Sequence, residues 1–101
     1  MLFGKTRSIY LILGVTDMRK SINKLSIKIA LMKDVNLYDG SMFVFCSKNK
    51  KNIKILFYDE NGFCLFQKKL NNFIFMWPKD IKEIKKIDEK LLKNLINCIY
   101  Q

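Results

Sequence analysis

Apolar residues in the first third of the chain change from a continuous run to a helical spacing. Residues 8–13 form a short apolar run that is typical of a buried strand. Beyond Gly14, apolar positions recur at intervals of four, three, four and three residues, as on one face of a helix: Met18, Ile22, Leu25, Ile29 and Met32. We therefore expect a strand over 8–13, then a helix capped by Thr16 or Asp17 that ends near Met32 or Lys33.

The middle of the chain is rich in aromatic and β-branched residues divided by turn signals. It predicts four strands, over residues 42–46, 53–58, 63–68 and 73–77. Asp39-Gly40 is a turn dipeptide, and Asn61-Gly62 is expected to supply a positive φ in a tight hairpin loop. Pro78 lacks an amide hydrogen and should end the fourth strand.

The last fifth of the chain is charged and then amphipathic. Residues 79–87 are predicted to be irregular, and Asp88 is expected to cap a final helix from Glu89 to about Ile99. Together the elements predict an α+β fold, in which an antiparallel four- to five-stranded meander sheet packs one face against two helices. At 101 residues, the chain is expected to form a single domain over 1–101.

Charge narrows the class of partner. Nineteen Lys and Arg against nine Asp and Glu leave a net charge of +10. Residues 1–50 carry nine cations and three acids (+6) and residues 51–101 carry ten and six (+4), so the excess is not confined to a tail. A folded domain this basic favours a polyanionic partner, with nucleic acid ahead of an acidic protein and a membrane surface last.

Cysteine usage and hydropathy bear on the cellular compartment. The three cysteines, Cys46, Cys64 and Cys98, form no CxxC pair, and the chain has no histidine. This pattern predicts a reducing, cytoplasmic location and no metal or other cofactor. No apolar run approaches the roughly 20 residues that span a bilayer, so no membrane association is expected.

The segment TDMRK, residues 16–20, places an acid and two cations where the first strand gives way to the helix. One interpretation is capping, with Thr16 or Asp17 accepting the free amides of the first turn. The other is an anion site at the helix start, in which Arg19 and Lys20 hold a phosphate. Both interpretations remain open from the residues alone.

A second set of cations is expected at one end of the sheet. If the strands on either side of 59–62 pair, residue 58 faces 63, residue 53 faces 68 and Lys54 faces Gln67. The loop 48–51 then lies near the end of the partner strand, and six cations gather: Lys48, Lys50, Lys51, Lys54, Lys68 and Lys69. Such a tip can lie along a nucleic-acid backbone, or it can be a solvated hairpin with lysines guarding the strand edges.

The aromatic residues and the acids give weaker indications of function than the lysines do. The strand aromatics are expected in the core, and Tyr58, Phe66 and Trp77 could stack on bases only if one sheet face is open. The acids fall mainly at caps and turns, where Asp is expected for structural reasons. A metal-dependent nuclease using Asp17 and Asp59 is the enzymatic alternative, and the absence of acids within the strands argues against it.

Three motifs occur together in this chain: GVTDMRKSI, then MFVFCSKNKKNIKILFYDENGFCLFQKKL, then FIFMWP. In combination they resemble the TnpB, or second-frame, protein of the sixty-six group of bacterial insertion sequences, which is distinct from the RNA-guided nuclease also called TnpB. The resemblance runs from about Arg7 to Trp77 and weakly through the final helix. The chain departs from it in a hairpin tip of Lys and Asn rather than Arg, which favours backbone contact over bidentate readout of guanine.

The resemblance implies a helper in transposition, encoded beside a separate transposase that holds the catalytic acids. We expect a non-catalytic accessory protein whose partners are DNA, the transposase and other element-encoded proteins. The expected DNA contacts are Arg19, Lys20, Lys48, Lys50, Lys51, Lys54, Lys68 and Lys69. The alternative is a protein-interaction module that docks on the transposase without touching DNA.

Overall fold

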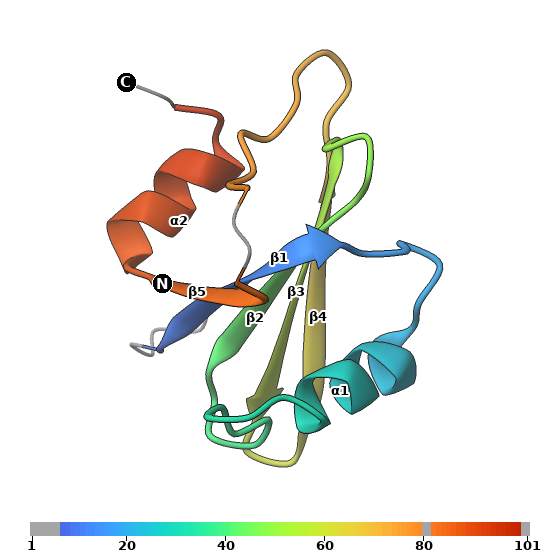
Figure 1. Cartoon of the computed structure of the whole chain (residues 1–101), viewed down its shortest axis with the longest axis vertical. Helices are drawn as coiled ribbons and strands as arrows, with labels where there is room; N and C mark the ends of the chain where they lie inside the picture. Colours follow the sequence, from blue (N-terminus) through green and yellow to red (C-terminus); the bar gives the residue numbers. More distant parts are fainter. Residues whose placement is uncertain (1–6, 80–81, 100–101) are drawn as a thin grey trace.

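The computed structural model describes residues 7–79 and 82–99 of the chain. Within these ranges, five strands and two helices follow one another in the order drawn in Figure 1: β1 (Ile9–Val15), α1 (Ile22–Ala30), β2 (Met42–Cys46), β3 (Asn52–Asp59), β4 (Gly62–Lys69), β5 (Ile84–Ile87) and α2 (Glu89–Ile96). The described residues contain no helix long and apolar enough to span a membrane. The five strands and two helices confirm the α+β class predicted from the hydrophobic pattern.

The strands form one mixed sheet in the order β4-β3-β2-β1-β5. β1 and β2 are parallel, because α1 carries the chain back along the sheet between them, while the other three neighbouring pairs are antiparallel. The antiparallel meander predicted above is thus correct only for β2, β3 and β4. The predicted register is confirmed there, with Tyr58 opposite Phe63, Ile53 opposite Lys68 and Lys54 opposite Gln67.

The predicted fourth strand is wrong, and the fifth strand lies where irregular chain was expected. Residues 73–77 pair with no strand: the Phe75 amide donates to the carbonyl of Lys50 in a loop (2.7 Å), and the Trp77 amide donates to the carbonyl of Phe75 (3.0 Å). Instead β5 pairs with β1, with Ile87 opposite Ile9. Its two lysines, Lys85 and Lys86, are compatible with an edge strand that keeps polar side chains in water.

The two helices cover opposite faces of the sheet, so the prediction that both lie on one face is also wrong. On the α2 face, Leu92 and Leu95 pack on alternate residues of the strands, such as Val44 and Ile55. On the α1 face, Leu25 and Ile29 pack in a second core that includes Phe43, Phe45 and Leu56. The sequence of β2 already indicated this arrangement, because its five consecutive residues are apolar and all are buried. A strand that is apolar on both sides requires cover on both faces of the sheet.

The two helix starts differ. Asp88 caps α2 as predicted, its carboxylate accepting the Leu91 amide at 2.8 Å. The first helix begins at Ile22, later than predicted, and Ser21 is its N-cap without a side-chain hydrogen bond. Its last residue is Ala30, so the predicted helix is shortened at both ends. As a result, TDMRK forms a loop between β1 and α1 and does not form the first turn of a helix.

The predicted turns are confirmed with one change of detail. Gly40 has a φ of +87°, and a Cβ atom there would lie 3.1 Å from Nη1 of Arg7, so both conformation and space favour glycine. In the β3–β4 hairpin the positive φ (53°) falls on Glu60, so the expectation that Asn61-Gly62 supplies it is wrong. The hairpin itself and its register are unaffected.

Candidate nucleic-acid interface

Two loops meet at the end of the sheet where the parallel strands β1 and β2 terminate. The loop after β1 and the β2–β3 loop line one open depression, formed by residues 15–18 on one side and by 47–49 and 52 on the other. The Thr16 amide donates to the carbonyl of Cys46 at 2.9 Å and holds the first loop against the sheet. The two basic segments selected from the sequence are therefore neighbours in space, and we call this region the loop end.

Arg19 is paired within its own loop. Its guanidinium donates to both carboxylate oxygens of Asp17, with Nη2–Oδ2 at 2.7 Å and Nε–Oδ1 at 3.0 Å, and its amide also donates to Oδ1 at 2.9 Å. These hydrogen bonds hold the pKa of Asp17 well below its usual range and raise that of Arg19. Neither capping nor a helix-start phosphate site describes this loop, because Asp17 partners Arg19 and neither lies in the helix.

Lys54 has a structural position. Its side chain is almost fully buried, at 7% exposure, on the α1 face of β3. The ammonium donates to the carbonyl of Met18 at 2.7 Å and to that of Lys20 at 3.0 Å. Lys54 therefore fastens the loop after β1 onto the sheet, and its Nζ is turned away from any surface ligand.

Lys68 also makes an internal contact. It lies opposite Ile53, on the face covered by α2, and its Nζ donates to the carbonyl of Ile96 at 2.9 Å. Ile96 is the last residue of α2, where the helix dipole favours a positive charge. The predicted convergence of six lysines at the hairpin tip is thus reduced by two, since Lys54 and Lys68 point to opposite faces of the sheet.

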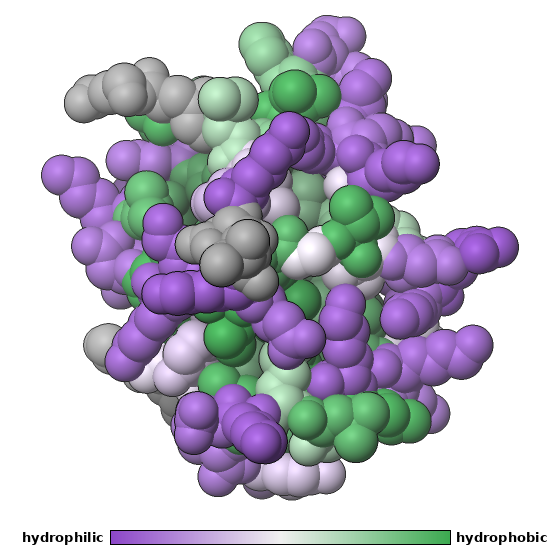
Figure 2. Space-filling view, viewed as in Figure 1, coloured by the Kyte–Doolittle hydropathy of each residue, from purple (hydrophilic) through white to green (hydrophobic). Residues whose placement is uncertain are grey.

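The other five predicted contacts present their charges at or beside the loop end: Lys20, Lys48, Lys50, Lys51 and Lys69. Among the described residues, none of their ammonium groups has a hydrogen bond or ion pair. Lys69 lies opposite Asn52, and the Lys51 carbonyl accepts the Leu70 amide at 2.8 Å, so the end of β4 adjoins the β2–β3 loop. In Figure 2 hydrophilic side chains gather at the upper right, over this end of β3 and β4.

The electrostatics of α1 agree with a local excess of positive charge. Burial lowers the pKa of Lys28, and repulsion from Lys20 lowers it further, against a weaker opposing effect from Glu83. The repulsion indicates that the charge of Lys20 lies near Lys28 on this helix.

The aromatic side chains that were candidates for stacking on bases pack against other residues of the protein. Tyr58 lies at the opposite end of β3, where its ring meets Phe63 edge-on at 5.1 Å. Phe66 and Trp77 pack against the core under α2. Sequence reasoning missed Phe73, which was expected within a strand and is 67% exposed. No local pattern distinguished Phe73 from Phe75, which is fully buried.

The two acids considered for a metal site, Asp17 and Asp59, lie at different ends of the described sheet. No group of three or more Cys, Asp or Glu side chains there could hold a metal ion. Asp59 accepts from Nη2 of Arg7 at 2.9 Å at the far end of β3, while Asp17 lies at the loop end with Arg19. Arg7 was not among the predicted site residues, and its guanidinium also lies over the Phe57 ring.

Comparison with known proteins adds a context for this surface. A family model described as "IS66 Orf2 like protein" matches residues 7–100. A curated relative, "Uncharacterized protein y4hO" from Sinorhizobium fredii (strain NBRC 101917 / NGR234), is 32% identical over 75 residues, or 74% of this chain. The match spans 65% of that relative's length. No solved structure matches the chain.

Proposed function

Because the chain belongs to the family of IS66 Orf2-like proteins, whose members serve insertion sequences as accessory proteins, we propose that it is a non-catalytic DNA-binding factor in transposition. In this proposal, the loop end lies along the sugar–phosphate backbone of element DNA and a separate transposase carries out the chemistry. Lys20, Lys48, Lys50, Lys51 and Lys69 would contact phosphates. Arg19, Lys54 and Lys68 would act within the protein.

The observation that carries the proposal is the gathering of five lysines on two adjoining loops and the end of β4, whose ammonium groups have no hydrogen bond within the described part of the chain. Lysine is a compact point charge without the planar fork of arginine, so it suits phosphate contact better than base readout. Binding would draw its free energy mainly from release of counterions and would show little preference for sequence.

Salt dependence tests the proposal. Five neutralised phosphates predict a slope of about −4.5 in a plot of log affinity against log salt for duplex DNA. We expect the triple variant Lys48→Ala, Lys51→Ala, Lys69→Ala to reduce the slope to about −1.8. The control removes the same charge elsewhere, at three exposed lysines on the helices and their ends: Lys33→Ala, Lys90→Ala and Lys93→Ala.

Equal slopes for the two triple variants would refute this interface, because binding would then follow net charge and not position. Retention of the chain on immobilised transposase after nuclease digestion, together with a flat salt slope for the chain alone on duplex DNA, would favour a protein-docking module instead. The two results separate DNA contact from docking because only DNA contact depends on phosphate.

A further inference from the structure

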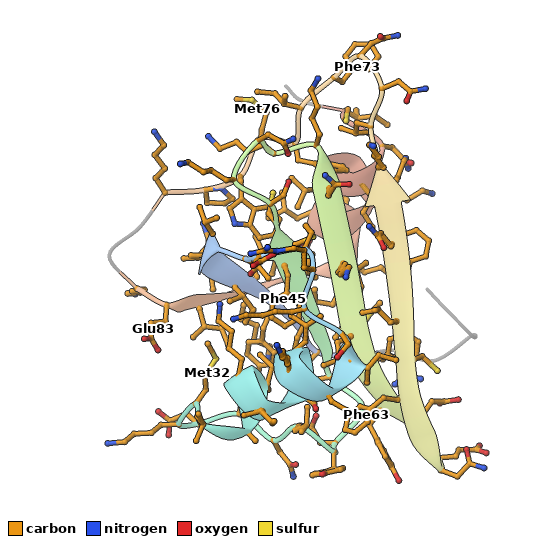
Figure 3. The ribbon with its side chains drawn as sticks, turned by 90° about the vertical axis from the view of Figure 1, so that its right-hand side faces the viewer. Met32, Phe45, Phe63, Phe73, Met76 and Glu83 are labelled. Carbon is orange, nitrogen blue, oxygen red and sulfur yellow. The ribbon has the colours of Figure 1, made fainter. Side chains whose placement is uncertain are left out.

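Three large apolar side chains are exposed on the segment between β4 and β5. Phe73, Ile74 and Met76 are 67%, 48% and 60% exposed. Figure 3 places Phe73 at the extreme tip of the molecule, with Met76 close to the same end and Phe63 at the opposite end. The segment therefore extends the loop end beyond the sheet with an apolar point.

The exposed side chains are carried by an anchored backbone. The Leu70 amide donates to the Lys51 carbonyl at 2.8 Å and the Phe75 amide to the Lys50 carbonyl at 2.7 Å. Phe75 itself is fully buried in the core beneath α2. Because both ends of the tip are tied to the lysine-bearing β2–β3 loop, Phe73 and Ile74 occupy a defined position relative to Lys50 and Lys51.

The surroundings of the tip indicate which partner it fits. Lys69 precedes it and Lys79 follows it along the chain, while Lys50 and Lys51 lie at its base. Asn71 and Asn72, both exposed, adjoin Phe73. A narrow apolar point among cations and amide donors matches a duplex, which offers phosphates outside, hydrogen-bond acceptors in the minor groove and stacked bases between them.

We propose that Phe73 and Ile74 form an apolar wedge that enters a base step of the DNA held by the loop-end lysines. This inference rests on the proposed function and specifies how the DNA is deformed. Apolar side chains inserted in this way unstack a base step partially and kink the duplex, so that more of the basic surface reaches phosphates. The protein would then prepare DNA by bending it, without cutting it.

The test uses a short duplex that carries several 2-aminopurine bases, whose fluorescence rises when they unstack. We expect the wild-type protein at saturation to brighten the duplex. The variant Phe73→Ser, Ile74→Ser should abolish the brightening and lower affinity about tenfold. Its salt slope should stay unchanged, since no cation is removed.

The matched control is Ile27→Ser, Leu31→Ser, which alters two apolar residues of comparable exposure (59% and 81%) on the α1 side. It should retain both affinity and brightening, and circular dichroism checks that each variant is folded.

Wild-type binding with the expected salt slope but without brightening would overturn the wedge and leave the proposed function standing. Absence of DNA binding would overturn both. Loss of transposase retention in the tip variant, with DNA binding and brightening intact, would identify the tip as a protein contact and overturn the wedge.

Discussion

Replacing Lys54 with methionine separates an internal cation from one that contacts DNA. The lysine ammonium lies 2.7 Å and 3.0 Å from two backbone carbonyls and its side chain is almost fully buried. Methionine keeps an apolar side chain of similar length at this buried position but has no donor. The variant therefore removes the two hydrogen bonds and the charge while leaving most of the packing in place.

The expected loss follows from the two contacts. Hydrogen bonds from a charged donor contribute about 1.5–3 kcal/mol each, or about 3–6 kcal/mol for the pair. Removing the ammonium also removes the desolvation penalty of a buried ion, which is several kcal/mol and offsets part of that loss. We expect Lys54→Met to lower the free energy of unfolding by about 2 kcal/mol, and the melting temperature by about 10 °C.

Urea denaturation, followed by the fluorescence of the single tryptophan, Trp77, measures the change. The control is Lys48→Met, an exposed lysine on the β2–β3 loop, which should alter the free energy of unfolding by less than about 0.5 kcal/mol. The reasoning would be refuted if Lys54→Met left stability unchanged and reduced the DNA salt slope by about 0.9, the amount expected for one lost phosphate contact.

Three further predictions concern Arg7, Cys46 and Asp17. Arg7→Met should lower the free energy of unfolding by about 3 kcal/mol in urea titrations, because the side chain is 4% exposed and pairs with Asp59. Burial raises the pKa of the Cys46 thiol to about 11, so at pH 8 iodoacetamide should leave Cys46 unmodified until the protein unfolds, as read by mass spectrometry. Asp17→Asn should tighten DNA binding about threefold in anisotropy titrations, because it removes an acid from the loop end and releases Arg19.

Each of these has a contrary outcome. Unchanged stability in Arg7→Met would mean that water replaces the guanidinium without loss. Stability that rises between pH 9 and pH 11 would contradict the Cys46 assignment: with the native pKa raised, the unfolded chain ionises first, so this thiol favours unfolding as pH rises through that window. Weaker DNA binding by Asp17→Asn would show that the Asp17–Arg19 pair shapes the loop, and that its charge matters less than its geometry.

Sequence reasoning succeeded where local chemistry dominates and failed where tertiary contacts decide. The β3–β4 register followed from one hairpin turn, and the Asp88 cap from one side chain. The parallel β1–β2 pair and the strand at 84–87 depend on contacts between distant segments, which no local pattern specifies. The hairpin register brought the end of β4 to the loop 48–51, but no local pattern showed that the loop after β1 adjoins them or which lysines turn inward.

Buried and surface lysines have different parts in the proposed DNA contact. Lys54 holds the carbonyls of Met18 and Lys20, and so it fixes where the half-buried Lys20 side chain starts. In the proposed interface, a buried cation of this kind contributes nothing to counterion release but determines the spacing of the lysines that would. Lys54→Met should therefore weaken DNA binding a few-fold at constant salt slope, whereas Lys51→Met should change the slope itself. If both variants altered slope and affinity in the same proportion, DNA binding would depend on the total charge and not on where the lysines are placed.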